Sequence, residues 1–312
     1  MVKQKVILIG GPTGVGKTAL AIKLARLFDG EIISCDSVAI YKKLNIGSAK
    51  PTPEEQKQAK HYMIDIVEPE SEYSVSDYRN EAERLISDIA SRGKTPIVVG
   101  GTGLYMKALL FPMELGKSEK NEDVRQKYRQ LALEKGNQFL LDYLKQIDPQ
   151  SAQNLHEKDL PRIIRAIEIY ETTGKKKSDY KTELKSKFDY KLFLLNDDRK
   201  ILYDRINARV DKMLQDGLER EVKSLVDAGL TRENQSMHAI GYKEWFDYFE
   251  DKISKEQLIS QIKQNSRHYA KRQLTWFKAM PNVEIVDCKN TQGIVEEVDR
   301  FLKSKNNKAS CD

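Results

Sequence analysis

The sequence predicts an α/β protein in which an all-α domain is inserted into a core built on a parallel β-sheet. Four short apolar segments have the composition of buried strands, namely residues 6–9, 31–35, 96–99 and 191–195. Residues 63–67 could add a further strand, and residues 76–92 have the apolar spacing of a helix. Between residues 113 and 190 the apolar strands disappear and a charged helical pattern dominates. We therefore expect a core made of residues 1–112 and 191–312, with residues 113–190 as the helical insert.

The composition restricts the class of protein. The chain has 312 residues, of which 39% are hydrophobic and 32% charged, with a net charge of +6, which suits a globular protein with one additional domain. No apolar run approaches the roughly 20 residues of a membrane span, and the first strand begins too early for a signal peptide. The three cysteines, Cys35, Cys288 and Cys311, lie far apart, which excludes a zinc module and a disulfide framework. We therefore expect a cytoplasmic protein, and nothing in the sequence demands more than a monomer.

The first apolar strand leads into a phosphate-binding loop, Gly-Pro-Thr-Gly-Val-Gly-Lys-Thr at residues 11–18, and then into helix-patterned residues 19–28. Glycines allow consecutive backbone N–H groups to point inward, while Lys17 adds a charge and Thr18 offers a hydroxyl to Mg²⁺. The residues expected to bind phosphate are Gly11, Pro12, Thr13, Gly14, Val15, Gly16, Lys17 and Thr18. The motif predicts a P-loop NTPase-like core that binds a polyphosphate or pyrophosphate ester.

Two further strand ends place polar residues at the same edge of the sheet, because ligands gather at the C-terminal ends of parallel strands. Residues 31–35 end at Asp36, for which three roles stay open: a Mg²⁺ ligand, a general base, or a cap of the next turn. Residues 96–99 lead through Gly-Gly-Thr-Gly into a helix at residues 104–110 and bring Thr102 to this edge. No apolar strand ends in a second magnesium-binding Asp, which argues against an ATPase or a motor protein.

The insert contains three segments of helical pattern, at residues 123–135, 139–147 and 160–170. Its distal end, residues 175–187, contains six lysines and is either a solvated loop or a contact for nucleic acid. A helix at residues 198–214 follows the insert and carries Arg205 and Arg209 on one face. This arginine pair is either solvated or a clamp for an anion.

The long helical segment at residues 254–278 has an unusual distribution of charge. Its second half, residues 261–278, has no carboxylate and five basic residues: Lys263, Arg267, Lys271, Arg272 and Lys278. The first three form a stripe along one face, since four residues make about one helical turn. An acid-free basic stripe favours binding to the phosphates of a nucleic acid. We expect Trp276 and Phe277 to pack in the core rather than to stack on bases.

Together these motifs resemble those of the bacterial tRNA dimethylallyltransferases, also called tRNA isopentenyltransferases. The matching segments, in order, are residues 11–18, 31–37, 41 with 45–52, 73–75, 99–105, 162–168, 239–244 and 269–277. They cover nearly the whole chain, and such an ordered set is much more specific than a phosphate loop alone. The chain departs from the family pattern at Val38-Ala39, where the family usually has an apolar residue and Gln, and this leaves open the side-chain contact expected at position 39.

The resemblance implies transfer of a dimethylallyl group from dimethylallyl diphosphate to N6 of the adenosine just 3′ of the anticodon in tRNA. The catalytic residues that it implies are Asp36, Lys17, Thr102 and Arg209, with Arg205 as a substitute for Arg209. Asp36 would accept the proton of the adenine amino group as a general base. The two cations, together with Mg²⁺ held partly by Thr18, would stabilise the departing diphosphate. Thr102 would hold the base or the diphosphate.

The resemblance also implies contacts between tRNA and the core, the insert and the long C-terminal helix. The residues expected at these contacts are Asp36, Ser37, Val38, Ala39, Thr102, Arg125, Leu160, Pro161, Arg162, Ile163, Ile164, His238, Gly241, Tyr242, Lys243, Lys271, Arg272, Gln273 and Trp276. The target base must leave the stack of the anticodon loop to reach such a site.

Three alternatives remain open. A prenyltransferase acting on free AMP or ADP would share the core but would lack the segments that bind tRNA. A P-loop kinase of a small metabolite would use Asp36 for the acceptor hydroxyl or the metal, and would need neither the basic helix nor an insert of this size. A non-enzymatic RNA-binding module would have no need for an Asp beside the phosphate site.

Overall fold

A computed structural model describes residues 3–111, 120–180 and 184–304. The chain divides into two compact units. The core unit comprises residues 1–110 and 186–312, and the helical unit comprises residues 111–185.

The core unit resumes shortly before residue 190, the predicted end of the insert. The core unit resumes at Ser186, whose carbonyl oxygen accepts a hydrogen bond from Lys3 Nζ (2.7 Å) ahead of the first strand. A strand of the core then begins at Asp189. The predicted start of the insert at residue 113, as well as Lys181 and Cys311, lies outside the described residues.

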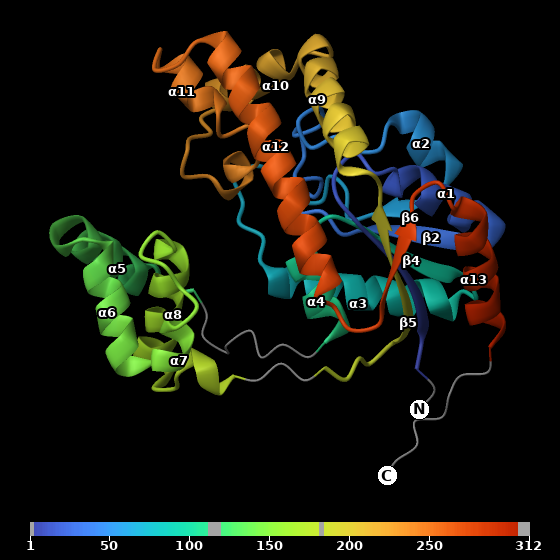
Figure 1. Ribbon diagram of the computed structural model, residues 1–312, viewed down its shortest axis with the longest axis horizontal. Coiled ribbons are helices and arrows are strands. Elements are labelled where there is room, and N and C mark those ends of the chain that lie inside the picture. Colours follow the sequence, from blue (N-terminus) through green and yellow to red (C-terminus); the bar gives the residue numbers. More distant parts are fainter. Residues whose placement is uncertain (1–2, 112–119, 181–183, 305–312) are drawn as a thin grey trace. The chain divides into compact units, whose positions relative to one another are not determined.

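Within the described residues, one sheet organises the core unit (Figure 1). Its strands are β1 (Lys5–Gly10), β2 (Gly30–Ser34), β3 (His61–Tyr62), β4 (Thr95–Gly100), β5 (Asp189–Asn196) and β6 (Val283–Asp287). They lie in the order β3-β2-β4-β1-β5-β6, and every neighbouring pair is parallel. The C-terminal ends of β1, β2 and β4 therefore meet at one edge, as the sequence predicts. The predicted fold class, a P-loop-like α/β core with a helical insert, is confirmed.

Helices cover the sheet and extend beyond it. The helices of the core unit are α1 (Lys17–Leu27), α2 (Pro53–Gln58), α3 (Val75–Ser91), α4 (Gly103–Leu110), α9 (Arg199–Gln215), α10 (Leu218–Asp227), α11 (Trp245–Phe249), α12 (Lys255–Lys278) and α13 (Thr291–Lys303). Alternate strand residues such as Ile7 and Ile9 share one apolar cluster with α1 and α13. A second cluster, which includes Trp245 and Tyr242, joins α9, α10 and α12. These two clusters hold α9 and α12 next to the strand ends.

Most predicted elements form within one or two residues of their expected bounds, but the strand predicted at residues 63–67 is wrong. Met63 and Asp65 have φ values of 61° and 55°, a left-handed backbone that cannot continue a strand. Pairing with β2 stops after Tyr62, and only an isolated bridge from Tyr41 to Val67 follows. β6 and α13 are not predicted from the sequence. β6 is an edge strand with Glu284 and Asp287 among its five residues, so it lacks the apolar run of a buried strand.

The helical unit consists of α5 (Glu122–Lys135), α6 (Asn137–Ile147), α7 (Pro149–Ala152) and α8 (Leu160–Thr173) around their own apolar cluster. At its centre the fully buried Glu168 accepts hydrogen bonds from Arg125 (3.0 and 3.0 Å) and Arg165 (2.7 Å). The arginines hold the pKa of Glu168 below its usual range, against the effect of burial. Arg125 is thus part of an internal ion pair, although a quarter of its side chain remains exposed.

Candidate active site

The phosphate-binding loop joins β1 to α1 and takes backbone conformations that glycine adopts readily. Gly14 and Gly16 have φ values of 81° and 95°. Gly16 is the N-cap residue of α1 and has no side chain with which to cap it. The N–H groups of the first helical turn are therefore placed to bind an anion, which the helix dipole also favours.

Two cations lie at this loop. Lys17 Nζ donates to the Pro12 carbonyl oxygen (2.8 Å), and Arg209 Nη1 donates to Thr13 Oγ1 (3.0 Å). Burial, and then the charge of Arg209, lower the pKa of Lys17 to about 8, and burial also lowers the pKa of Arg209. Both side chains hydrogen-bond only to neutral oxygens of the described residues. Two neighbouring cations without a bonded carboxylate suit a multiply charged anion such as a diphosphate.

The geometry distinguishes the two arginines of α9. Arg205 is exposed and pairs with Asp197 (2.8 Å), a carboxylate that also accepts from Cys288 Sγ (3.2 Å). Arg209, one turn later, contacts the phosphate loop. The structure therefore favours Arg209 over Arg205 for contact with a diphosphate.

Asp36 lies directly after β2. Its negative charge acts against the effect of burial on the pKa of Lys17 and of Arg209, because it favours their charged forms. Its Oδ1 accepts the N–H groups of Val38 (2.8 Å) and Ala39 (3.2 Å), which is the capping role anticipated from the sequence. Its Oδ2 has no hydrogen-bond partner among the residues that the structure describes. One oxygen of the carboxylate is therefore fixed by the backbone, and the other is available to a substrate.

Thr102 joins the second glycine turn to the turn of Asp36. Its hydroxyl accepts the Ser37 N–H (3.0 Å) and donates to Ser37 Oγ (3.3 Å), and its N–H donates to the Cys35 carbonyl oxygen (3.1 Å). Thr102 thus fixes the residues on both sides of Asp36. A direct contact between Thr102 and substrate stays a prediction.

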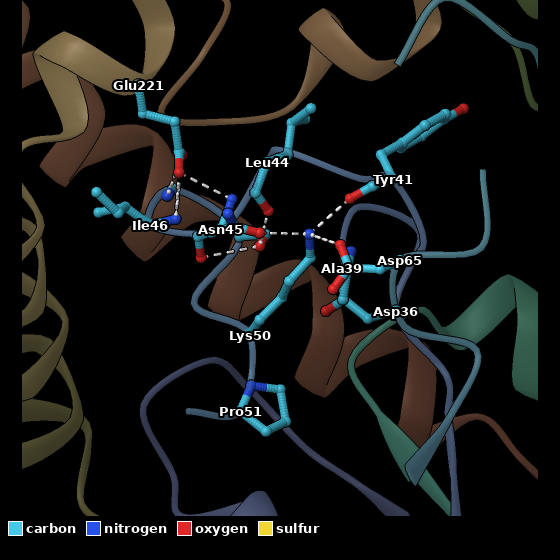
Figure 2. A network of polar contacts seen from close by, with 12 residues as sticks. Asp36, Ala39, Tyr41, Leu44, Asn45, Ile46, Lys50, Pro51, Asp65 and Glu221 are labelled. Carbon is cyan, nitrogen blue, oxygen red and sulfur yellow. Dashed lines mark hydrogen bonds and ion pairs between the residues drawn. The ribbon is translucent and has the colours of Figure 1, made fainter. Parts of the chain in front are cut away.

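Figure 2 shows that the loop after Asp36 is held from two sides. Lys50 Nζ, on a side chain that is 6% exposed, donates to Asp65 Oδ1 (2.6 Å) and to two oxygens of its own loop. From α10, the Glu221 carboxylate accepts the N–H groups of residues 45–47 at 2.8–3.1 Å. These contacts give the loop a defined shape next to the phosphate site.

The basic stripe predicted along α12 is only partly free. Lys263 pairs with Asp211 of α9 (2.6 Å), and Arg267 donates to Asn207 of the same helix (2.7 Å). Helix α9 therefore supplies a carboxylate to the half of α12 that has none of its own, and binding of the stripe to phosphates stays a prediction. Lys271 and Arg272 remain exposed.

The other residues predicted to contact tRNA divide by exposure. Exposed are Pro161, Arg162, His238, Lys243 and Trp276, whereas Ser37, Val38 and Leu160 are partly exposed. Buried are Ala39, Ile163, Ile164, Gly241, Tyr242 and Gln273. The hydroxyl of Tyr242, for example, donates a hydrogen bond to Glu221 (2.7 Å). Contact with tRNA stays a prediction for all of these residues. The expectation that Trp276 packs in the core is wrong, because its side chain is 39% exposed, while Phe277 is fully buried as predicted.

The roles of Lys50 and Glu221 in holding the loop after Asp36 are not predicted from the sequence. Lys50 lies in the segment at residues 45–52 that resembles the family, so this segment could have indicated that Lys50 has a role. Glu221 has no comparable signal, since an acidic residue in the first turn of a charged helix normally favours the helix dipole. Its contact with the N–H groups of residues 45–47 follows only from the fold.

The residues at the phosphate loop fit a bound Mg²⁺. This ion usually keeps several waters and takes one or two protein oxygens together with substrate phosphate oxygens. Thr18 offers a hydroxyl in the first turn of α1, and the charge of Asp36 acts on Lys17 next to it. Thr18 as the metal ligand stays a prediction.

Comparison with known proteins identifies the family. The IPP transferase family model matches residues 39–280 of the chain. The chain belongs to the IPP transferase family. A tRNA dimethylallyltransferase of Bacillus cereus is 45% identical over 98% of both chains, and one of Bacillus anthracis is 45% identical over 98% of this chain and 99% of its own.

Members of the IPP transferase family also have similar structures. The tRNA isopentenylpyrophosphate transferase of Bacillus halodurans is 40% identical, with a TM-score of 0.74 over 96% of this chain and 97% of its own. A eukaryotic dimethylallyltransferase, solved as snapshots of its action on tRNA, is 31% identical, with a TM-score of 0.80 over 98% of this chain and 81% of its own. The sequence-based resemblance to this family is confirmed. Among the described residues of this member, no helix is both long and apolar enough to span a membrane.

Proposed function

We propose that this protein transfers a dimethylallyl group from dimethylallyl diphosphate to N6 of the adenosine 3′-adjacent to the anticodon in tRNA, releasing diphosphate. The observation that carries the proposal is the pair of cations, Lys17 and Arg209, at a phosphate loop with Asp36 beside them. The names of relatives that are 45% identical over the whole chain support tRNA as the acceptor. We place the reaction in the cytoplasm and assign it to the monomer.

The diphosphate binds at the N-terminus of α1, where the loop amides, Lys17 and Arg209 face it. As the allylic C–O bond breaks, its electron pair leaves with the diphosphate, and these donors stabilise the added charge. Mg²⁺, held by Thr18, would supply further charge neutralisation of the leaving diphosphate.

The adenine N6 attacks the allylic carbon from the side of Asp36. Its lone pair is delocalised into the ring, so removal of a proton as the C–N bond forms lowers the barrier. Asp36 Oδ2 accepts that proton, while Oδ1 stays bonded to the Val38 and Ala39 N–H groups and keeps the carboxylate oriented. Thr102 holds the turn that carries Asp36 through Ser37.

A competing function is prenylation of free AMP or ADP. The exposed Lys271 and Arg272 on α12 favour the larger, polyanionic acceptor, because a mononucleotide has few phosphates for them to bind.

The proposal is tested with two anticodon stem-loop RNAs that differ at one base. One carries adenosine at the position 3′ of the anticodon, and the other carries purine riboside, which lacks the 6-amino group. Incubation with dimethylallyl diphosphate and Mg²⁺ followed by nucleoside mass spectrometry should find the N6-dimethylallyl product in the first RNA alone. Absence of the product from the adenosine RNA and from full-length tRNA would contradict the proposal.

A further inference from the structure

Gln273 is a buried polar residue in a helix whose neighbouring positions are exposed. It lies on α12 and is 4% exposed, whereas Lys271 and Arg272 beside it are exposed. Burying a primary amide costs free energy unless both its oxygen and its nitrogen are hydrogen-bonded. Its partners therefore indicate its role.

The amide of Gln273 connects the two glycine turns at the strand ends. Its Oε1 accepts the Thr13 N–H of the phosphate loop (2.9 Å), and its Nε2 donates to the Gly101 carbonyl oxygen after β4 (3.0 Å). The flipped amide would oppose donor to donor and acceptor to acceptor, so this orientation is determined by the partners. Because β1 and β4 are neighbours in the sheet, one side chain links two adjacent strand ends.

Glycines make this contact possible. A Cβ at Gly101 would lie 2.1 Å from Gln273 Nε2, and a Cβ at Gly103 would lie 2.3 Å from Trp276 Cδ1. Neither glycine has a positive φ, so neither is required by backbone conformation. Gly101 and Gly103 of the second turn thus leave room for the side chains of α12.

We propose that Gln273 is a positioning residue for the diphosphate and that it acts through Thr13 on Arg209. Gln273 holds the Thr13 N–H, and the Thr13 hydroxyl accepts from Arg209 Nη1 (3.0 Å). The amide therefore sets where the tip of the loop, and with it the guanidinium, stands relative to Lys17. This role is distinct from the predicted contact of Gln273 with tRNA and rests on the proposed function, in which Arg209 binds the diphosphate.

The first variant is Gln273→Met, which keeps the length of the side chain and removes both hydrogen bonds. We expect the affinity for inorganic pyrophosphate, measured by calorimetry with Mg²⁺, and kcat/KM for dimethylallyl diphosphate to fall by about 10²-fold, the usual cost of a misplacement of about 1 Å. The affinity for tRNA should be unchanged. The matched control is Asn265→Leu on the same helix, which removes one amide contact, to Glu244 (2.7 Å), and should leave pyrophosphate binding unchanged.

The second variant is Gly101→Ala, which leaves Gln273 in place but pushes its amide away, so it tests the same link if Gln273→Met folds poorly. It should also weaken pyrophosphate binding. In addition, Gln273→Met combined with Thr13→Val should lose no more affinity than the worse single variant, because both act on Arg209 by one route.

Wild-type pyrophosphate affinity in Gln273→Met and Gly101→Ala, or a loss confined to tRNA binding, would overturn the inference. A wild-type protein that binds pyrophosphate but transfers no prenyl group would overturn the proposed function and leave the positioning role standing. A wild-type protein that does not bind pyrophosphate would overturn both.

Discussion

The two oxygens of Asp36 have different surroundings, which bears on the roles that the sequence leaves open for this residue. Oδ1 is bonded to the N–H groups of Val38 and Ala39, while Oδ2 has no such partner among the described residues. Capping and proton transfer are therefore compatible, because each uses a different oxygen. The same hydrogen bonds orient the carboxylate, so the cap contributes to the chemistry that we propose.

Because the two oxygens of Asp36 have different roles in this proposal, two substitutions of Asp36 should have different effects. Asp36→Asn keeps an oxygen that can cap the turn but cannot take a proton, so kcat should fall by about 10²-fold or more while tRNA affinity and the melting temperature stay close to wild type. Asp36→Ala should lose the same turnover and should also unfold more easily, because the two N–H groups lose their acceptor. Single-turnover rates and thermal unfolding separate these effects. A wild-type rate in Asp36→Asn would remove Asp36 from proton transfer.

The pKa of Lys17, lowered to about 8 by burial and by Arg209, predicts the pH dependence of diphosphate use. In the free protein the ammonium loses its proton as the pH rises through this value. Since kcat/KM reports the free enzyme, kcat/KM for dimethylallyl diphosphate should fall above pH 8, at most by about tenfold per pH unit. A bound diphosphate favours the charged form, so kcat at saturation should persist to higher pH. A value of kcat/KM that stays flat from neutral pH to well above 8 would contradict this assignment.

At the scale of elements, β2 contains a buried carboxylate that links it to α3. Glu31 is 4% exposed and accepts from Arg92 Nη1 (2.8 Å) and Nη2 (2.6 Å), and Tyr62 of β3 donates to it (2.8 Å). The bonds to Arg92, and then that to Tyr62, lower the pKa of Glu31 to about 2 against the effect of burial. A carboxylate whose pKa is lower in the folded protein than in the unfolded chain stabilises the fold at pH values above its ordinary pKa. This contribution is lost as the pH falls towards 2.

Glu31→Gln should therefore lower the free energy of unfolding by about 2 kcal/mol at neutral pH, the scale of a hydrogen bond to a charged group. The deficit should shrink below the ordinary pKa of 4.5, as the wild type loses the same contribution. Urea unfolding at several pH values measures it. Glu81→Gln is the control, because its pair with Arg84 (2.6 Å) is exposed and should matter little. A deficit independent of pH would mean that Glu31 acts through packing alone.

The basic residues of α12 form two groups. Lys263 and Arg267 contact α9, whereas Lys271 and Arg272 are exposed to solvent. Lys271→Ala with Arg272→Ala should weaken tRNA binding and reduce the slope of log Kd against log salt by about one per lost phosphate contact. Lys263→Ala is the matched control, because Lys263 already pairs with Asp211 and should leave the slope unchanged. Filter binding at several salt concentrations measures all three. Equal slopes in both variants and the wild type would assign Lys271 and Arg272 to another role.

For the whole molecule, the order of elements along the sequence predicts most of the fold. Strand periodicity and glycine turns locate the strand ends, and parallel pairing then brings the phosphate loop, Asp36 and Thr102 to one edge. Periodicity fails at residues 63–67, where positive φ values break the strand, and at β6, an exposed edge strand.

The site is predictable only for residues whose role is carried by local sequence. The loop and Lys17 follow from a motif, but Glu221 and the true partners of Gln273 depend on packing between helices and turns far apart in the chain. The pairing of Lys263 in the basic stripe of α12 is unpredictable for the same reason, since Asp211 belongs to another helix. The sequence of one helix does not indicate which of its charged side chains pair with charged side chains of neighbouring helices.

The most direct test of the account is a transfer assay with radiolabelled dimethylallyl diphosphate and Mg²⁺, in which unmodified tRNA, AMP and ATP are offered side by side. Prenyl transfer to tRNA predicts label in tRNA, none in AMP, and no consumption of ATP. Label in AMP alone would contradict tRNA as the acceptor and leave the exposed Lys271 and Arg272 unexplained. An absence of label from both, with ATP consumed instead, would contradict prenyl transfer itself and favour a kinase.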